Sequence, residues 1–173
     1  KLTNCRIYGN EGYYGGAYGN YATFTNCLIE GNVAHNRAGG IYISSNTSLL
    51  HCGIYNNTAP NYGSGIYVGE NTGNYLRNSV VWGNNGSVAI YNSGYINVTY
   101  SAVEGGVYGT GNINLTSANM GDVMSPCFTS PETGDWTLQS ASILINKGVT
   151  LTDMPATDLV GNDRIQQSVP DLG

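Results

Sequence analysis

The sequence predicts an all-β protein, a right-handed parallel β-helix with about 22–27 residues per coil and an irregular C-terminal cap. Three observations lead to this prediction. Charged residues make up only 10% of the 173 residues, against about 25% in an ordinary globular domain. The chain is instead rich in Gly (25), Asn (22) and Tyr (14). Two short motifs also recur with one shared period, which indicates stacked copies of one structural unit.

The first motif supplies one strand of each coil. Its clearest copy reads Phe24-Thr-Asn-Cys-Leu-Ile-Glu-Gly-Asn32. Its alternation over so few residues is typical of a strand rather than a helix. A small residue recurs at intervals of 22, 25, 27 and 22 residues, at Cys5, Cys27, Cys52, Ser79 and Ser101. Two positions later lies an aliphatic row, Ile7, Ile29, Ile54, Val81 and Val103. We expect both rows to face the core, with ~4.8 Å between neighbouring coils.

The second motif supplies a strand on another face of the coil. It reads Gly39-Gly-Ile-Tyr42 in its clearest copy and recurs at intervals of 24, 25 and 24 residues. Its aliphatic members are Ala17, Ile41, Ile66 and Ile90, and each is followed by Tyr18, Tyr42, Tyr67 or Tyr91. If the aliphatic row faces in, the four tyrosines form a ladder on the surface. The opposite orientation would bury four hydroxyls that all need partners.

A closing Asn ends most copies of the first motif, at Asn10, Asn32, Asn57 and Asn84. Asn tolerates the left-handed backbone of a tight corner and hydrogen-bonds locally. Stacked Asn side chains also bond to one another as an amide ladder. A Gly precedes the closing Asn in three copies and supplies a second permissive backbone position. The high Asn and Gly content is therefore assigned to corners.

Two parts of one domain are expected, the coils at residues 1–115 and a capping segment at residues 116–173. The chain begins inside a repeat, which suggests a piece of a longer protein. The period fades near residue 115, and Pro126, Pro131 and Gly134 then interrupt the pattern around a short alternating strand at 135–138. Such a segment would shield the core and strand edges at the end of a solenoid.

The cysteines divide into a row of three, Cys5, Cys27 and Cys52, and a separate Cys127. Adjacent coils bring the row within disulfide reach by distance alone, but parallel side chains in register do not readily give the torsion of a disulfide. Ser at the next two positions of the row indicates that a small residue is what this position needs. A buried stack of free thiols is favoured over a disulfide, and no His lies at the spacing of a zinc site.

The paired motifs resemble the repeats of chlamydial polymorphic outer-membrane proteins and their bacterial β-helix relatives. The end of the chain resembles the C-terminal region of bacterial surface proteins called choice-of-anchor Q domain proteins. The matching residues are Ser125, Pro126, Phe128, Pro131, Gly134, Asp135, Trp136, Leu138, Ser142, Ile145, Asn146, Gly148, Pro155, Asp158, Leu159, Gly161 and Arg164. The resemblance implies an extracellular, bacterial cell-surface β-helix protein. In such proteins a sorting or anchoring signal usually follows.

Outward-facing aromatic residues are the candidate binding sites. They are the ladder Tyr18, Tyr42, Tyr67 and Tyr91, and a second outward row that contains Tyr8, Tyr55 and Trp82. Aromatic planes stack on sugar rings and amides bond to hydroxyls, so a neutral glycan suits this surface; a surface protein is the other expected partner. The leading hypothesis is a non-catalytic adhesin or stalk. The alternatives are a polysaccharide lyase or glycoside hydrolase with its catalytic coils outside this fragment, and a structural subunit or spacer.

No catalytic residue, metal or cofactor is assigned. Glu30 and Glu104 share an outward row but lie three coils apart, roughly 14 Å, which exceeds the usual separation of a catalytic carboxylate pair. His35 and His51 have no evident partner in the pattern. Ca²⁺ remains a possibility without support, because the tail acids Asp153, Asp158, Asp163 and Asp171 match no loop of fixed spacing. Six Lys and Arg argue against nucleic acid, and no run of 18 apolar residues predicts a membrane helix.

Overall fold

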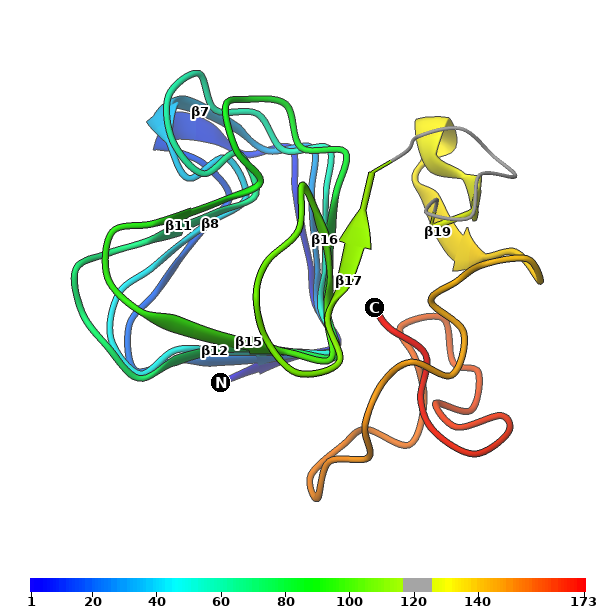
Figure 1. The fold of residues 1–173 in the computed structure, drawn as a ribbon. Helices are drawn as coiled ribbons and strands as arrows, with labels where there is room; N and C mark the ends of the chain where they lie inside the picture. The colour runs from blue at the N-terminus through cyan, green and yellow to red at the C-terminus, as the bar shows by residue number, and fades with distance from the viewer. Residues whose placement is uncertain (117–125) are drawn as a thin grey trace.

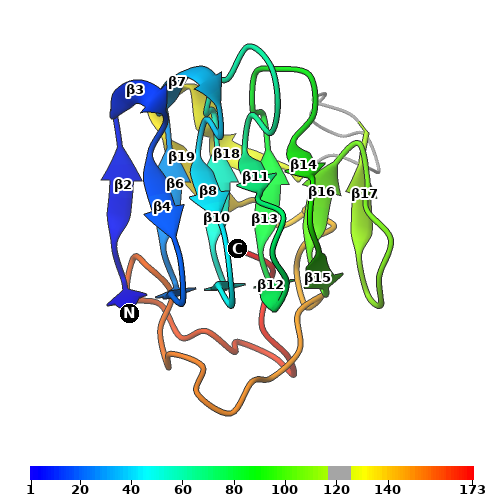
Figure 2. The ribbon, with the colours of Figure 1, turned by 90° about the vertical axis from the view of Figure 1, so that its left-hand side faces the viewer.

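A computed structural model describes residues 1–116 and 126–173 and confirms the predicted parallel β-helix. Figure 1 looks along the stacked coils, and three parallel sheets surround a common interior. Figure 2 shows the same coils side by side, running from the N-terminal coil to β17. Ser125, the first residue of the C-terminal phrase, lies outside the described residues.

Three sheets each take one short strand from successive coils. The six-stranded sheet consists of β2 (Arg6–Tyr8), β6 (Leu28–Glu30), β10 (Gly53–Tyr55), β13 (Val80–Trp82), β16 (Ala102–Glu104) and β17 (Ile113–Leu115). The five-stranded sheet consists of β1 (Leu2–Thr3), β5 (Thr23–Thr25), β9 (Ser48–Leu50), β12 (Asn74–Arg77) and β15 (Ile96–Thr99). The four-stranded sheet consists of β4 (Ala17–Gly19), β8 (Ile41–Ile43), β11 (Ile66–Val68) and β14 (Ile90–Asn92).

A fourth, smaller group of strands forms the corner that leads from the six-stranded to the four-stranded sheet. β3 (Glu11–Tyr14) pairs with β7 (Val33–Arg37). Single bridges extend this pairing to the next coils through Thr58 and Tyr62. This corner overhangs the four-stranded sheet in Figure 1.

The register between coils matches the repeat. In the six-stranded sheet, Ile29 pairs with Ile7 on one side and Ile54 on the other. In the four-stranded sheet, Ile66 pairs with Ile41 and Ile90. These rows pack into one buried cluster, which also holds Cys27 and Cys52, so both predicted aliphatic ladders are confirmed.

The three cysteines of the row, Cys5, Cys27 and Cys52, are free thiols. Cys27 and Cys52 are buried in the core cluster and Cys5 packs against it. Each of these three thiols lies close to a backbone carbonyl oxygen, at 3.3 Å for Cys5 and 3.4 Å for both Cys27 and Cys52. The favoured interpretation, a buried stack of thiols, agrees with this arrangement.

The closing asparagines form the predicted amide ladder. The Nδ2 of Asn10 donates to Oδ1 of Asn32, that of Asn32 to Asn57, and that of Asn57 to Asn84, at 2.9, 2.9 and 3.0 Å. The left-handed backbone lies one residue earlier, for example at Gly31, with φ of 59°. The closing Asn is therefore needed for its side chain, and the preceding residue makes the turn.

The C-terminal segment lies along the flank of the coils. Its hairpin of β18 (Phe128–Ser130) and β19 (Asp135–Leu138), closed by a short 3₁₀ turn at Pro131–Thr133, and the irregular chain that follows run beside the outer face of the six-stranded sheet (Figures 1 and 2). We expected this segment to shield the open end of the last coil. Its described part covers the side instead, because its apolar residues have a matching apolar surface there.

That lateral contact is a second hydrophobic core. Tyr55, Val80 and Trp82 of the sheet pack with Phe128 and Leu144 of the C-terminal segment. Burying large apolar side chains contributes about 1.5–3 kcal/mol each. The non-repeating segment is therefore held by the same kind of burial that holds the coils together.

Candidate functional site

The predicted tyrosine ladder exists on the outer face of the four-stranded sheet. Tyr18, Tyr42, Tyr67 and Tyr91 pair in register through four successive strands. Ring centroids lie 5.4 Å apart between Tyr18 and Tyr42, 5.0 Å between Tyr42 and Tyr67, and 5.3 Å between Tyr67 and Tyr91. The orientation with isoleucine inside and tyrosine outside is thus confirmed.

The overhanging corner adds aromatic residues and one cation to this face. Tyr14 contacts Tyr42 edge-on at 5.4 Å, and Tyr62 contacts Tyr91 at 4.5 Å. Arg37 lies over the Tyr67 ring at 5.0 Å and its Nη1 donates to the Tyr67 hydroxyl at 2.9 Å. We call this surface the tyrosine face, defined by Tyr14, Tyr18, Tyr42, Tyr62, Tyr67, Tyr91 and Arg37.

Stacking decides what the tyrosine face presents to solvent. The planes of Tyr42 and Tyr67 lie 27° from parallel, and those of Tyr67 and Tyr91 lie 19° from parallel, so these rings cover one another. Tyr67 is only 7% exposed, whereas Tyr18, on the edge strand β4, is 62% exposed. The middle of the ladder is largely enclosed, and accessible ring surface lies mainly at Tyr18 and at the exposed Tyr14 and Tyr62 of the corner.

The second outward row is mostly covered. Tyr8 is exposed, but Tyr55 is 3% exposed and Trp82 is buried. Trp136 stacks on Tyr55 with centroids 4.3 Å apart, and Phe128 meets the same ring at 5.1 Å. The expectation that Tyr55 and Trp82 are exposed binding residues is therefore wrong. Both point away from the coil as predicted, but the C-terminal segment covers them.

The two carboxylates of this row have structural partners. Glu30 is buried, pairs with Arg6, and accepts a hydrogen bond from the Trp136 indole nitrogen. Glu104 accepts from the Gly83 backbone N–H at 3.0 Å. Glu30 therefore joins the N-terminal coil to the C-terminal segment. In addition, His35 Nε2 lies 3.2 Å from Glu11 Oε1, a partner that the repeat pattern did not reveal.

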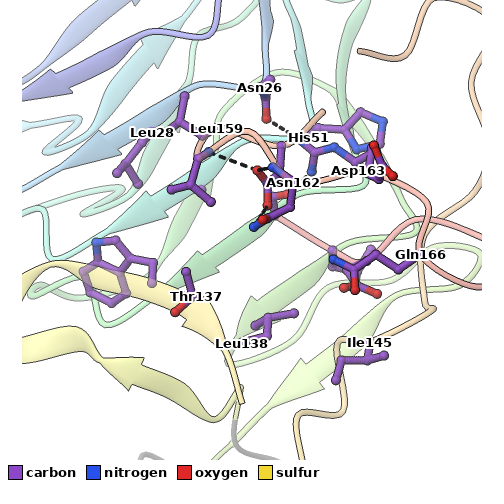
Figure 3. Close-up of a pocket in the computed structure, with 18 of the residues that line it drawn as sticks. Asn26, Leu28, His51, Thr137, Leu138, Ile145, Leu159, Asn162, Asp163 and Gln166 are labelled. Atoms are coloured by element: carbon purple, nitrogen blue, oxygen red, sulfur yellow. Dashed lines mark hydrogen bonds between the residues drawn. The ribbon is translucent and has the colours of Figure 1, made fainter. Parts of the chain in front are cut away.

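A pocket of about 530 Å³ opens between the six-stranded sheet and the C-terminal segment, and the repeat pattern does not predict it. Figure 3 shows four polar residues, Asn26, His51, Asn162 and Asp163, near one end of the pocket, with Leu138 and Ile145 toward the other. Non-repeating residues between Gly134 and Gly173 form much of the wall. No periodic signal marks such residues, which is why the sequence did not locate the pocket.

His51 and Arg164 are two of the buried titratable groups of this wall, which also contains Cys27 and Tyr55. His51 is 2% exposed, and burial together with the nearby Arg164 charge lowers its pKa from 6.5 to about 3. Arg164 is 6% exposed, and burial also lowers its pKa. Arg164 donates to the Gly173 carbonyl at 2.6 Å and to Oδ1 of Asn26. His51 is neutral at physiological pH, whereas Arg164 keeps its charge.

The tail acids form separate local contacts. Asp158 Oδ1 accepts from the backbone N–H of Asn162 at 2.8 Å, within its own turn, and Asp171 accepts from the Asn146 backbone N–H at 2.7 Å. Within the described residues, no group of three or more His, Cys, Asp or Glu side chains is placed to hold a metal ion. No helix among those residues has the length and apolar character to cross a membrane.

Comparison with known proteins gives the family. The family model described as "Right handed beta helix region" matches residues 1–149, which covers all the coils and the C-terminal hairpin. No curated protein and no solved structure matches the chain significantly. The match agrees with the three parallel sheets, the register and the ladders. The chain belongs to the right-handed β-helix family.

Proposed function

We propose that this chain is a segment of an extracellular, bacterial cell-surface protein that acts as an adhesin or stalk and binds neutral glycan at the tyrosine face. The observation that carries the proposal is the ordered row of tyrosines, which gathers exposed aromatic rings beside a corner that holds Tyr14 and Arg37. The low charge of the chain favours an uncharged ligand. The resemblance of the C-terminal phrase to bacterial surface proteins supports the cellular location.

The exposure of each tyrosine ring indicates where a glycan would contact the tyrosine face. A sugar ring would stack on Tyr18 or Tyr14, which are exposed and both contact Tyr42 at one end of the ladder, because the middle rings cover one another. Hydroxyl groups of the sugar would bond to the phenol groups along the ladder and to the guanidinium of Arg37. A longer glycan would then follow the coil axis across successive tyrosines.

A glycan array tests the proposal with the wild-type protein and the double variant Tyr14→Ala/Tyr18→Ala. Each lost aromatic contact is worth about 1 kcal/mol, so the double variant should bind roughly thirtyfold more weakly. Tyr8→Ala is the matched control, because Tyr8 is equally exposed but lies on a different sheet. Equal binding by the wild type and the double variant would overturn the site, and no glycan binding at all would favour a spacer or assembly subunit.

A further inference from the structure

The wall of the pocket beside the six-stranded sheet contains two buried N–H groups without an acceptor. Nδ1 of His51 and Nε of Arg164 have no hydrogen-bond partner among the described residues. Both side chains are more than nine-tenths buried and both line the pocket. Leaving a buried donor unpaired costs about 1–3 kcal/mol, more for a charged group. An oxygen acceptor inside the pocket would remove this cost.

Neighbouring hydrogen bonds establish which nitrogen of His51 carries the proton. The Asn78 amide is oriented by Val149, since its Nδ2 donates to the Val149 carbonyl at 2.6 Å and its Oδ1 accepts from the Val149 N–H at 2.9 Å. Nδ2 of Asn78 also lies 3.2 Å from Nε2 of His51. An amide nitrogen only donates, so Nε2 is the acceptor. The proton of the neutral ring is therefore on Nδ1, the nitrogen without a partner.

Arg164 presents a related requirement. Its two terminal nitrogens donate to the Gly173 carbonyl and to Asn26, which hold the guanidinium against the corner between the five- and six-stranded sheets. It forms no ion pair with any Asp or Glu side chain in the described ranges. Its Nε–H therefore remains for an acceptor supplied by something other than these residues.

The charges around the pocket select the class of acceptor. Among the described lining residues, the carboxylates of Asp135, Asp158, Asp163 and Asp171 face the single positive charge of Arg164. An anionic ligand would meet net repulsion from these groups. A hydroxyl group suits the site better, because it accepts from the buried N–H groups and donates to aspartate or amide oxygens.

We propose that this pocket binds one or two rings of a neutral saccharide, with hydroxyl oxygens accepting from His51 Nδ1 and Arg164 Nε. Its volume of about 530 Å³ lies within the roughly 300–1,000 Å³ of small-ligand sites. Leu138 and Ile145 face the polar end across the pocket and offer apolar surface for the C–H groups of the ring (Figure 3). This second site does not depend on glycan binding at the tyrosine face.

Two tryptophans make the test specific, because the chain contains only Trp82 and Trp136. Trp136 lines the pocket, whereas Trp82 is buried in the second core and is not part of the pocket wall. ¹⁵N-labelled protein is titrated with glucose, galactose, N-acetylglucosamine and cellobiose, and with glucuronate as the anionic probe, to roughly 20 mM. A neutral saccharide should shift the Trp136 indole signal saturably and leave that of Trp82 unchanged.

His51→Asn removes the ring Nδ1–H and suits the backbone of this corner; its amide is expected to pair within the Asn row, as that of Asn26 does with Asn4. Asn26 and Asn78 occupy the equivalent corner in the adjacent coils with φ of 53° and 51°, close to the 52° of His51. The variant should bind about tenfold more weakly. The variant Tyr14→Ala/Tyr18→Ala should bind the saccharide in its pocket with the affinity of the wild type. This result would separate the pocket from the tyrosine face.

Three results would overturn the proposal. The first is the absence of a saturable Trp136 shift with any neutral probe, which is expected if only water occupies the pocket. The second is binding of glucuronate as tight as that of glucose, and the third is an undiminished saccharide affinity in His51→Asn. Pocket binding that persists when the tyrosine-face variant loses array binding would support both sites separately. Array binding without a Trp136 response would retain the tyrosine face alone.

Discussion

Two outer faces of the coils follow the same alternation of inward and outward side chains, but one is largely open to solvent and the other is covered. On the four-stranded sheet, the outward tyrosines stack on one another, enclose the middle ring of Tyr67 and end at the exposed Tyr18. On the six-stranded sheet, the outward Tyr55 and Trp82 lie beneath Phe128 and Trp136. Alternation therefore determines which way a side chain points. Whether it becomes surface or core depends on what the rest of the chain lays over it.

The covered face also explains where the pocket lies. The C-terminal segment meets the sheet tightly at Tyr55 and holds further polar contacts at Asn26 and Asn78. Between these contacts the irregular backbone of the segment does not follow the regular sheet, and the pocket is the space left between them. The tyrosine face has no such covering segment among the described residues. Binding there would occur on a surface, and binding beside the six-stranded sheet would occur in a partly open pocket.

The largest expected effect is on stability, and it compares a buried and an exposed residue of the outward row of the six-stranded sheet. Tyr55→Ala should lower the free energy of unfolding by about 3–5 kcal/mol, because it opens a cavity where Trp136 and Phe128 pack. Tyr8→Ala, in the same outward row but exposed, should change it by less than about 0.5 kcal/mol. Urea unfolding of both variants measures the difference. Similar losses would mean that the covering segment contributes little.

A pH effect of intermediate size distinguishes the covered side from the exposed one. The unfolded chain protonates His51 near pH 6.5, whereas the folded protein resists protonation until about pH 3. Stability from this group is therefore complete above pH 6.5 and falls as pH decreases, at about 1.4 kcal/mol per unit. At pH 4 the loss should reach roughly 3 kcal/mol.

His51→Asn provides the control for this pH dependence, because Asn does not titrate and fits the corner backbone. The difference in unfolding free energy between wild type and variant should shrink or reverse in favour of the variant between pH 7 and pH 4. Unfolding by urea at several pH values measures it, and the aspartates contribute equally to both proteins. Parallel plots of unfolding free energy against pH for the two proteins would show that protonation of His51 does not destabilise the folded protein.

Much of the coil architecture could be predicted because the repeat samples each structural position several times. Four or five copies show that Ile29 and Ile41 belong to inward rows and that Asn57 belongs to a stacked row. The C-terminal segment occurs once, so the sequence gives no comparison from which to read its orientation. The apolar residues of this segment indicate that it packs against another surface, but the sequence pattern does not indicate which surface that is.

The candidate sites divide along the same line. The sequence predicts the tyrosine ladder because its members recur with the coil period, although it does not reveal that Tyr42 and Tyr67 cover one another. His51 replaces the Asn found at this corner in neighbouring coils, and that departure from the row was the available signal for the pocket. Arg164 carries no comparable signal, because its contacts with Asn26 and Gly173 join positions far apart in the sequence.

The smallest expected effect concerns the exposed face and tests whether the tyrosine ladder is held by more than stacking. Tyr67→Phe keeps the ring between Tyr42 and Tyr91 but removes the hydroxyl that accepts from Arg37 at 2.9 Å. Hydrogen bonds to charged groups contribute about 1.5–3 kcal/mol when buried, and partial exposure of Arg37 reduces this to about 1 kcal/mol. Tyr91→Phe, at the neighbouring position of the ladder, is the control and should change stability by less than about 0.5 kcal/mol. Differential scanning calorimetry of both variants measures the effect, and equal melting temperatures would show that stacking alone orders the tyrosine face.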